Sequence, residues 1–577
     1  MVAQVPMNPQ RMTLPEPLRT QVAETARAWH ASGHVARLWA RDTSLWTGAD
    51  EDRWLGWLDA PETAREAIDE LQAFAKELAR EKFTHALLLG MGGSSLAPEV
   101  MRLTYGHVPG APDFHVLDST DPAQVASMEA RVDLRRTLVI VASKSGSTLE
   151  PNVFKQYFFD RVAQAVGRER AGSHFVAITD PGSKMQQVAE ADGFRRVFLG
   201  MPSIGGRFSA LSPFGLVPAA VMGMDLKRFV TDAEAMAAAC RRPDPAVNPG
   251  VLLGLVLGMA AKAGRDKLTI VTSPEIFDLG AWLEQLIAES TGKQGKAIIP
   301  VDLEALRAPE TYGPDRLFVS LRTAGPWDAA PESALHALES AGHPVVHIEL
   351  ADAHALAQEF FRWEIATAVA GSVLGVNPFD QPDVEASKVA TRTLTSAFEA
   401  TGTLPAEGAL LREGTLAFHA DTANARALER TPGDRSGIGL MKAHLGRIGR
   451  GDYFALLAYV EMSAANQRLL QDIRHLVATR LHAPTCLGFG PRFLHSTGQA
   501  YKGGPNTGVF LQVTCDDAAD LPVPGQKYTF GVVKAAQAAG DFQVLNDRGR
   551  RALRVHLGPD VADGLARLRT LVEEALG

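Results

Sequence analysis

The fold is decided by the stretch Thr137-Leu-Val-Ile-Val-Ala142, together with Ser143-Lys-Ser-Gly-Ser-Thr148 and Leu149-Glu-Pro-Asn-Val-Phe-Lys-Gln-Tyr-Phe-Phe159 after it. The apolar, β-branched first part predicts a buried strand, and the last part predicts a helix. Between them lie four hydroxyl residues and one glycine. Hydroxyls and the free N–H groups at a helix start can together bind one phosphate. A serine-rich turn that only caps the helix is an equally acceptable reading of these residues.

Similar strand–loop–helix units surround this stretch. Strands are expected at 85–89, 114–117, 175–180 and 196–199, and a helix begins at Leu96. Near-continuous apolar strands alternating with helices are typical of a parallel sheet covered on both faces. After a helical stretch at 214–263 the pattern restarts. Its expected strands are 268–273, 297–301, 317–321 and 345–349, and its expected helices are 279–290, 355–374 and 384–400.

We therefore expect an α/β protein with two tandem parallel-sheet units. Residues 1–60 form an N-terminal helical segment, 61–235 the first unit and 236–400 the second. Residues 401–577 form a C-terminal α/β region, in which 401–450 is expected to be a loop-rich connection. Whether this region is a third unit or an elaboration of the second stays open.

Composition excludes several classes of protein. The 577 residues are 46% hydrophobic and 21% charged, as in a globular protein with a large core. A net charge of −8, with no sustained basic run, argues against a nucleic-acid partner. Three widely spaced cysteines argue against a disulfide scaffold or a zinc ribbon. With no signal pattern and no apolar run long enough for a membrane span, a cytoplasmic protein is expected.

Two glycine-rich turns are candidate parts of a site. Gly90-Met-Gly-Gly-Ser-Ser95 lacks the last glycine of a dinucleotide fingerprint and offers hydroxyls instead, which favours a sugar or phosphate oxygen. A purely structural turn is the alternative. Gly205-Gly-Arg207 can present a guanidinium to a cleft. A solvated loop arginine is the alternative there.

Three further candidates can supply acid–base chemistry. Gln285 and Glu289 are four residues apart on one helix face, and Glu289 lies in the last turn, where the dipole disfavours its negative charge and makes it a reasonable base. Lys388 lies near the start of a helix, and His495 lies in a Gly/Ser-rich loop. Taken singly, each could be a solvent-facing residue without a function.

Taken together, five motifs in this order resemble the glucose-6-phosphate isomerase family, most closely the isomerase half of bifunctional transaldolase/glucose-6-phosphate isomerase proteins. They span about residues 85 to 390, and no transaldolase barrel precedes them, so the isomerase alone is expected. The motifs are Gly92-Gly93-Ser94-x-Leu96, Ser143-Lys144-x-Gly146-Ser147-Thr148, Gly205-Gly206-Arg207-Phe208-Ser209, Gln285-xxx-Glu289-Ser290-x-Gly292-Lys293 and Phe379-Asp380-Gln381-xx-Val384-Glu385-xx-Lys388.

The resemblance implies two tandem sugar-isomerase (SIS) domains, each a parallel sheet sandwiched by helices, and the pattern of 401–577 adds a C-terminal α/β extension. It implies reversible interconversion of glucose 6-phosphate and fructose 6-phosphate through an enediolate, in glycolysis and gluconeogenesis, without metal or organic cofactor. Glu289 resembles the base, Arg207 the cation that stabilises the enediolate, and Lys388 a participant in ring opening. The residues that would bind substrate are Gly93, Ser94, Ser143, Lys144, Ser145, Ser147, Thr148 and Gln285.

The ring-opening histidine departs from the family order. Many members carry it between the catalytic glutamate and the lysine loop, where this chain has only His336, His343, His347 and His354, none in a matching motif. The best match, Leu494-His495-Ser496-x-Gly498-Gln499, follows Lys388, so His495 is the candidate. The resemblance implies that this histidine comes from the neighbouring subunit of a homodimer.

Two other classes of protein compete with the isomerase. A non-catalytic phosphosugar sensor would keep the 143–148 cradle but lack a pair such as Glu289 and Arg207, and it often carries a DNA-binding helix that this chain does not show. A nucleotide-dependent oxidoreductase is disfavoured by the incomplete fingerprint at 90–95. Among isomerase substrates, mannose 6-phosphate stays open.

Overall fold

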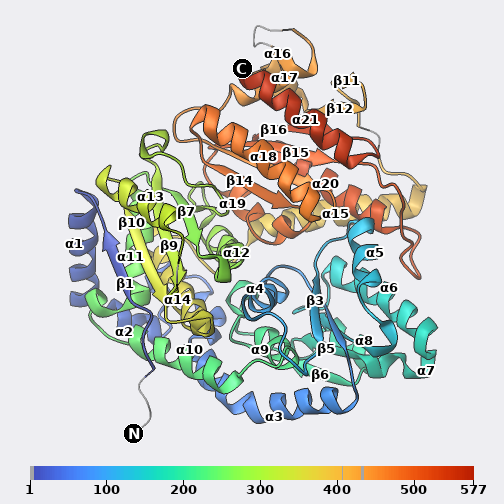
Figure 1. The fold of residues 1–577 in the computed structure, drawn as a ribbon, viewed down its shortest axis with the longest axis horizontal. Coiled ribbons are helices and arrows are strands. Elements are labelled where there is room, and N and C mark those ends of the chain that lie inside the picture. Colours follow the sequence, from blue (N-terminus) through green and yellow to red (C-terminus); the bar gives the residue numbers. More distant parts are fainter. Residues whose placement is uncertain (1–4, 326, 406, 430–433) are drawn as a thin grey trace.

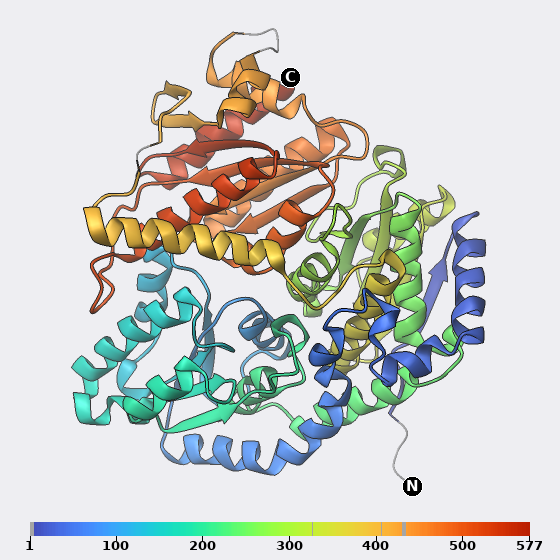
Figure 2. The ribbon, with the colours of Figure 1, turned by 180° about the vertical axis from the view of Figure 1, so that it is seen from behind.

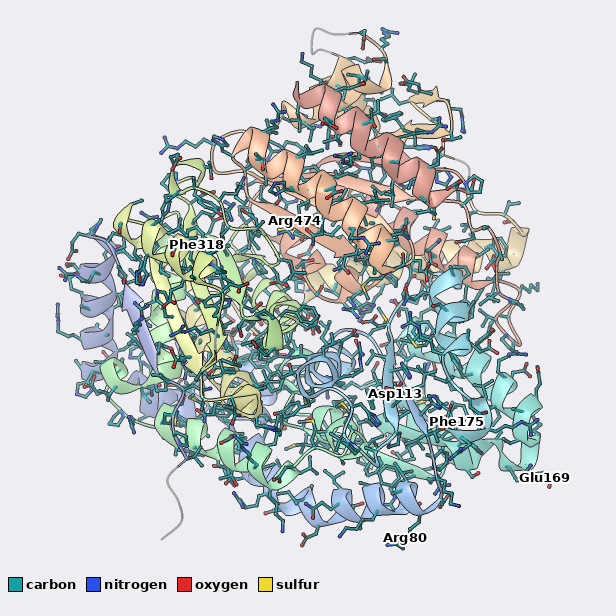
Figure 3. The ribbon with its side chains drawn as sticks, viewed as in Figure 1. Arg80, Asp113, Glu169, Phe175, Phe318 and Arg474 are labelled. Atoms are coloured by element: carbon teal, nitrogen blue, oxygen red, sulfur yellow. The ribbon has the colours of Figure 1, made fainter. Side chains whose placement is uncertain are left out.

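The strands of this protein form three sheets that surround a common centre. The computed structural model describes residues 5–325, 327–405, 407–429 and 434–577. In Figure 1 the first group of elements (blue to cyan) and the second (green to yellow) lie beside each other, and the third (orange to red) lies above both. Phe175 belongs to the first group, Phe318 to the second and Arg474 to the third (Figure 3).

The first sheet is parallel throughout, and each of its predicted strands is confirmed. Its order is β3-β2-β4-β5-β6. Helices α3, α4 and α9 cover one face, and α5, α6 and α8 cover the other. The strands are β2 (His85–Leu89), β3 (Asp113–Leu117), β4 (Thr137–Ala142), β5 (Phe175–Thr179) and β6 (Arg196–Leu199).

The second sheet has the order β1-β10-β9-β7-β8. Its four predicted strands are parallel to one another. They are β7 (Lys267–Thr272), β8 (Ile299–Val301), β9 (Arg316–Thr323) and β10 (Val345–Leu350). The N-terminal segment carries helices α1 (Leu18–Ala31) and α2 (His34–Trp39), as expected, but also a strand that was not predicted: β1 (Gln10–Thr13) adds to this sheet antiparallel to β10.

Residues 411–556 build a third sheet, of order β11-β12-β16-β15-β13-β14. Its β13, β14, β15 and β16 are parallel, and β11 and β12 add an antiparallel edge. The expectation that 401–450 is loop-rich was wrong, since β11, β12, α16 and α17 lie there. The strands are β11 (Leu411–Glu413), β12 (Leu416–His419), β13 (Tyr453–Tyr459), β14 (Thr485–Phe489), β15 (Gly508–Thr514) and β16 (Arg551–His556).

The helices join the three groups into one body. A single apolar core contains Phe74 of α3, Ile178 of β5 and Trp363 of α14, so the first two groups share it. Two smaller cores attach the third group to them, through Phe530 and Tyr453. Within the described ranges, no helix has the length and apolarity needed to span a bilayer. The helices are α1 (Leu18–Ala31), α2 (His34–Trp39), α3 (Ala60–Arg80), α4 (Leu96–Tyr105), α5 (Pro122–Ala130), α6 (Leu149–Val166), α7 (Arg168–Ala171), α8 (Lys184–Ala191), α9 (Pro213–Val221), α10 (Leu226–Cys240), α11 (Pro249–Lys262), α12 (Leu279–Thr291), α13 (Ala329–Ser340), α14 (Leu356–Leu374), α15 (Pro382–Thr401), α16 (Thr422–Glu429), α17 (Gly437–Leu445), α18 (Ala464–Leu481), α19 (Gly498–Gly503), α20 (Phe530–Asp547) and α21 (Val561–Leu576).

The strand order locates a crevice. In the first sheet the chain moves outward from β2 to β3 and then returns to the other side of β2 as β4. In open parallel sheets, ligands bind outside the carboxyl ends of the strands at such a switch point. The two predicted turns, 90–95 and 143–148, follow β2 and β4 and therefore meet there. Helix α15 runs along the base of the third group, between it and the first (Figure 2).

Candidate active site

The cradle at 143–148 connects β4 to α6, as predicted. Gly146 adopts φ +67°, and a Cβ there would lie 2.3 Å from the backbone nitrogen of Met185, so only glycine fits. The side chain of Asn152 donates hydrogen bonds to the carbonyls of Gly146 (3.0 Å) and Thr148 (2.7 Å) and fixes the loop. Thr148, the N-cap residue of α6, makes no side-chain cap. The first N–H groups of this helix thus have no side-chain acceptor from the cap residue.

The hydroxyls of the cradle are available to a ligand. Ser145 and Ser147 contact each other at 2.8 Å, and the buried Ser143 Oγ has no partner among the residues that the structure describes. Lys144 lines the same cleft, but its ammonium pairs with Asp180. Anion binding by Lys144 therefore requires it to share its charge with that carboxylate.

The glycine turn after β2 packs tightly against the rest of the site. A Cβ on Gly93 would lie 1.9 Å from the carbonyl oxygen of Gly206, and one on Gly92 would meet Gln285 Nε2 at 2.8 Å. These contacts bring the Gly-Gly-Ser and Gly-Gly-Arg turns together, and Ser94 lines the cleft beside them. The glycines of this turn thus allow it to pack closely against the Gly205–Arg207 turn and Gln285.

Arg207 is fully buried and rigidly held. Its Nε donates to Ser290 Oγ at 2.7 Å, and its Nη1 donates to Gln381 Oε1 at 2.9 Å. Its Nη1 also lies 3.4 Å from Glu289 Oε1. Burial lowers the pKa of Arg207, against the effect of the Glu289 and Asp380 charges. The neighbouring Phe208 stacks on Trp57, with ring centroids 5.2 Å apart, and meets Phe379 in a tilted arrangement at 5.3 Å.

Glu289 lies in the last turn of α12, as predicted, and is 6% exposed. Gln285, one turn earlier, donates from Nε2 to Glu289 Oε2 at 2.9 Å and to the carbonyl of His495 at 2.7 Å. One carboxylate oxygen is thereby held by an amide, while the other faces the Arg207 guanidinium. This places a fixed carboxylate next to a fixed cation.

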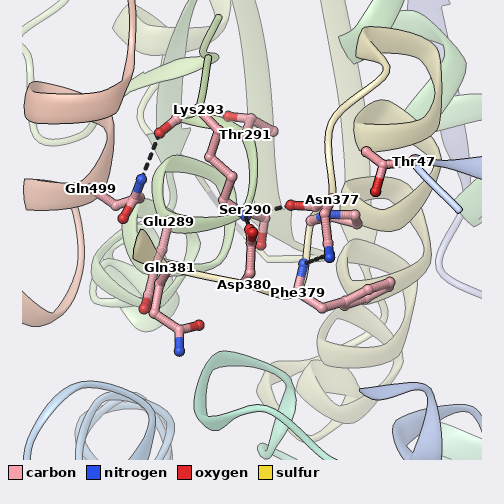
Figure 4. Close-up of polar contacts among 12 residues, drawn as sticks. Thr47, Glu289, Ser290, Thr291, Lys293, Asn377, Phe379, Asp380, Gln381 and Gln499 are labelled. Carbon is pink, nitrogen blue, oxygen red and sulfur yellow. Dashed lines mark hydrogen bonds and ion pairs between the residues drawn. The ribbon is translucent and has the colours of Figure 1, made fainter. Parts of the chain in front are cut away.

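Lys293 lies two residues after the end of α12, beside Asn377 and Asp380 (Figure 4). Its ammonium pairs with Asp380 Oδ1 at 2.8 Å and donates to the carbonyl of Asn377. Burial, together with the nearby Arg207 charge, lowers the pKa of Lys293 to about 7. The loop that supplies acceptors to Arg207 is thereby held to the end of α12.

His495 belongs to the same chain as the rest of the cleft. It ends the short 3₁₀ helix Arg492–His495 of the third group, and its Nε2 lies 2.9 Å from Glu150 Oε1. The structure therefore differs from the expectation that a neighbouring subunit supplies this histidine. His336, His343, His347 and His354 do not line the cleft.

Glu150 was missed from the sequence. This buried residue is the second of α6, directly after the cradle, and it also accepts from Gln537 Nε2 at 2.6 Å. Gln537 Oε1 in turn accepts from Thr120 Oγ1 at 2.6 Å. Burial raises the pKa of Glu150, but the charge and the hydrogen bond of His495 outweigh it, and the net shift is downward. The only available signal was a carboxylate beside a proposed anion site.

Lys388 completes the wall of the cleft from α15. Its side chain is 35% exposed, and its Nζ lies 3.8 Å from Glu385 Oε2. The cleft has a volume of about 480 Å³, within the usual range for small-molecule sites. An adjoining cavity of about 210 Å³ shares Lys388 and His495 with it. The structure brings to this one cleft all the predicted residues: Gly93, Ser94, Ser143, Lys144, Ser145, Ser147, Thr148, Arg207, Gln285, Glu289, Lys388 and His495.

An anion cradle at a sheet switch point, facing a fixed carboxylate and guanidinium, defines the class of α/β proteins that bind and transform a small phosphorylated substrate. Comparison with known proteins narrows this class. Residues 62–305 match the family model of phosphoglucose isomerase. A glucose-6-phosphate isomerase of Synechococcus sp. (strain CC9605) is 30% identical over 405 residues, which are 60% of this chain and 75% of the relative. The chain belongs to the phosphoglucose isomerase family.

Two solved structures share the fold. A hypothetical protein from Thermus thermophilus aligns with a TM-score of 0.58 and 26% identity, over 66% of this chain and 99% of its own. A glucose-6-phosphate isomerase from Chlamydia trachomatis aligns with a TM-score of 0.53 and 21% identity, over 66% of this chain and 86% of its own. About a third of this chain therefore lies outside each alignment.

Proposed function

We propose that this protein is a glucose-6-phosphate isomerase, an intramolecular oxidoreductase that interconverts glucose 6-phosphate and fructose 6-phosphate in glycolysis and gluconeogenesis. The observation that carries this proposal is the Glu289–Arg207 pair, which lies in one cleft with the hydroxyl cradle at 143–148. A phosphate bound in the cradle is remote from the reacting carbons. Its binding energy orients C1 and C2 against the pair.

The reaction begins with opening of the sugar ring. Ring opening needs an acid and a base near O5 and O1. His495 and Lys388 fill these roles, because both line the cleft and the adjoining cavity, which they reach from the third group and from α15. Glu150 is a positioning residue that orients the imidazole. The substrate phosphate is bound by Ser143, Lys144, Ser145, Ser147 and Thr148, while Gly93, Ser94 and Gln285 line the sugar.

Glu289 then moves a proton between C2 and C1. Removing a carbon-bound proton beside a carbonyl leaves negative charge on the enediolate oxygens, which a preorganised cation stabilises. Arg207 is that cation, because its contacts to Ser290 and Gln381 fix it before substrate arrives. The chain's own groups thus suffice for both proton transfers, so we propose catalysis without metal or organic cofactor.

The wider setting of the enzyme is part of this proposal. We place it in the cytoplasm as a homodimer that binds neither nucleic acid nor membrane. Its three cysteines are free, in keeping with a reducing compartment. We assign 61–235 and 236–400 to two SIS domains and 401–577 to a third α/β unit.

A coupled assay tests the activity directly. Fructose 6-phosphate is supplied with and without EDTA, and glucose 6-phosphate is detected through a reporter dehydrogenase. We expect equal turnover in both. No product in either condition would reject the isomerase, and activity lost only with EDTA would reject the metal-free mechanism.

A further inference from the structure

Gln499 lies at the junction of the three segments that carry the proposed catalytic groups. It belongs to α19, four residues after His495, and its side chain is fully buried. Figure 4 shows its amide directed towards the end of α12, close to Glu289. Nε2 of this amide donates a hydrogen bond of 2.9 Å to the carbonyl of Gly292.

The N-terminus of α15, the helix of Lys388, lacks a cap of its own. Its N-cap residue is Gln381, which makes no side-chain cap bond because its amide oxygen accepts from Arg207 instead. The free N–H groups at such a terminus need an acceptor. Gln499 Oε1 supplies it, since it accepts from the backbone nitrogens of Asp383 (2.9 Å) and Val384 (3.2 Å). These are the groups that an N-cap side chain ordinarily satisfies.

The donor end of the same amide holds the opposite helix terminus. Gly292, which accepts from Nε2, is the C-cap residue of α12, the helix of Glu289. Nε2 also donates to Asp383 Oδ2 at 2.9 Å. The four hydrogen bonds use both lone pairs and both protons of the amide, so the side chain has a single satisfied orientation.

Two glycines permit this close approach. A Cβ on Gly292 would lie 2.3 Å from Ala500 Cα, and a Cβ on Gly503 would lie 2.5 Å from both the Gly292 carbonyl oxygen and Asp383 Oδ2. The backbone of α19 is therefore packed directly onto both helix ends.

We propose that Gln499 is a positioning residue. Supplied from the third group, it caps the start of α15, the helix of Lys388, and binds the end of α12, the helix of Glu289. Because Gln499 follows His495 by four residues, it also connects both helix ends to the segment of His495. This inference rests on the proposed isomerase function. The start of α15 needs this outside cap because the amide oxygen of its own N-cap residue, Gln381, accepts a hydrogen bond from Arg207. One residue thus fixes the relative places of three catalytic groups that it does not touch.

The test compares Gln499→Met, which keeps the length of the side chain but removes all four hydrogen bonds, with a matched control. The control is Val477→Ala, because Val477 is fully buried in the third core and belongs to α18, away from α12 and α15. Each variant is measured for kcat with fructose 6-phosphate, for competitive inhibition by inorganic phosphate and for amide hydrogen exchange in the peptide covering 382–386.

We expect Gln499→Met to lower kcat roughly 10- to 100-fold, as a misplaced catalytic group does, and to speed exchange at Asp383 and Val384. Inhibition by phosphate should stay within about twofold of wild type, because the cradle is held by α6. Val477→Ala should change neither kcat nor exchange in that peptide. Gln499→Glu should be less active than the methionine variant, because its second oxygen faces Asp383 and the Gly292 carbonyl.

The inference is overturned if Gln499→Met keeps kcat within twofold, if exchange at 383–384 is unchanged, or if phosphate binding is lost in parallel with kcat. An inactive wild-type protein would instead refute the proposed function. The hydrogen-exchange comparison does not depend on activity, so it still tests the cap in that case.

Discussion

At the scale of single residues, the contact between Glu150 and His495 sets which imidazole nitrogen would act in the proposed ring opening. A proton on Nε2 donates to the buried carboxylate, which leaves Nδ1 as the nitrogen able to accept a proton. Glu150 is itself held by Gln537. The orientation and tautomer of the imidazole are therefore fixed by Glu150 of the first group of elements together with Gln537 of the third.

We predict that Glu150→Gln lowers kcat roughly 10- to 100-fold, because the amide loses the charge that orients and favours the working imidazole. His495→Asn should cause a similar or larger loss. Since the two act as one unit, the double variant should lose little more than His495→Asn alone. Steady-state assays of the wild type, the two single variants and the double variant form a double-mutant cycle. Losses that multiply fully would mean that the two residues act independently.

At the scale of elements, strands could be predicted where burial on both faces makes them continuous apolar runs. The strands at 85–89 and 137–142 are apolar runs because both faces of the first sheet are covered. By contrast, β16 (Arg551–His556) was missed because its arginines are not solvated but paired, Arg551 with Asp452 and Arg554 with Gln512. Local patterning carries no signal of such distant partners. The same reason hid β1, whose partner strand β10 lies more than 300 residues away.

The site shows the same division between local and distant information. Motifs could predict where Glu289, Arg207 and the cradle lie, because each motif carries its own local context: the last turn of α12, the turn between β6 and α9, and the turn between β4 and α6. Nothing in the sequence links Glu150 with Gln537, which come together only through packing of α20 against the first group. Likewise, the capping of α15 by Gln499 depends on the third sheet, whose extent the sequence left open.

Helix α17 contributes an acid-sensitive contact to the third group. His444 is fully buried, its Nε2 lies 3.0 Å from the carbonyl of Phe510, and burial, aided by Arg447, lowers the pKa of His444 to about 3. Between that value and the unfolded value of about 6.5, the unfolded chain binds a proton that the folded chain does not. The contribution of neutral His444 to the free energy of unfolding is therefore complete above about pH 6.5 and is lost as the pH falls.

We predict that wild-type protein loses about 2 kcal/mol of unfolding free energy through His444 between pH 7.5 and pH 5, and that His444→Gln abolishes this share. Urea unfolding at the two pH values measures it. His475→Gln, on the exposed surface of α18, is the control and should retain the wild-type acid loss. An acid loss equal in all three proteins would refute the assignment.

At the scale of the whole molecule, the third group supplies within one chain what the family resemblance had assigned to a neighbouring subunit. The cleft takes its cradle from the first group, Glu289 from the second and His495 from the third. The cores that attach the third group to the first two explain how a loop after β14 reaches that position. The histidine of the cleft therefore comes from the same chain as the cradle and Glu289.

We predict that two inactive variants cannot restore each other. If His495 acted across subunits, mixing Glu289→Gln with His495→Asn chains would create mixed dimers with one intact site. Because both groups belong to one cleft of one chain, co-refolded mixtures should show only the sum of the two residual activities. Recovery of a substantial fraction of wild-type activity would contradict the single-chain site.

The most direct test of the central claim is to follow deuterium during turnover of fructose 6-phosphate in D₂O, by NMR at C2 of the glucose 6-phosphate formed. A carboxylate that carries the proton through an enediolate exchanges part of it with solvent, so wild-type protein should place deuterium at C2. Glu289→Gln should slow both product formation and labelling roughly a thousandfold while still binding inorganic phosphate. Turnover without any deuterium at C2, or a Glu289→Gln rate within a few-fold of wild type, would contradict the mechanism.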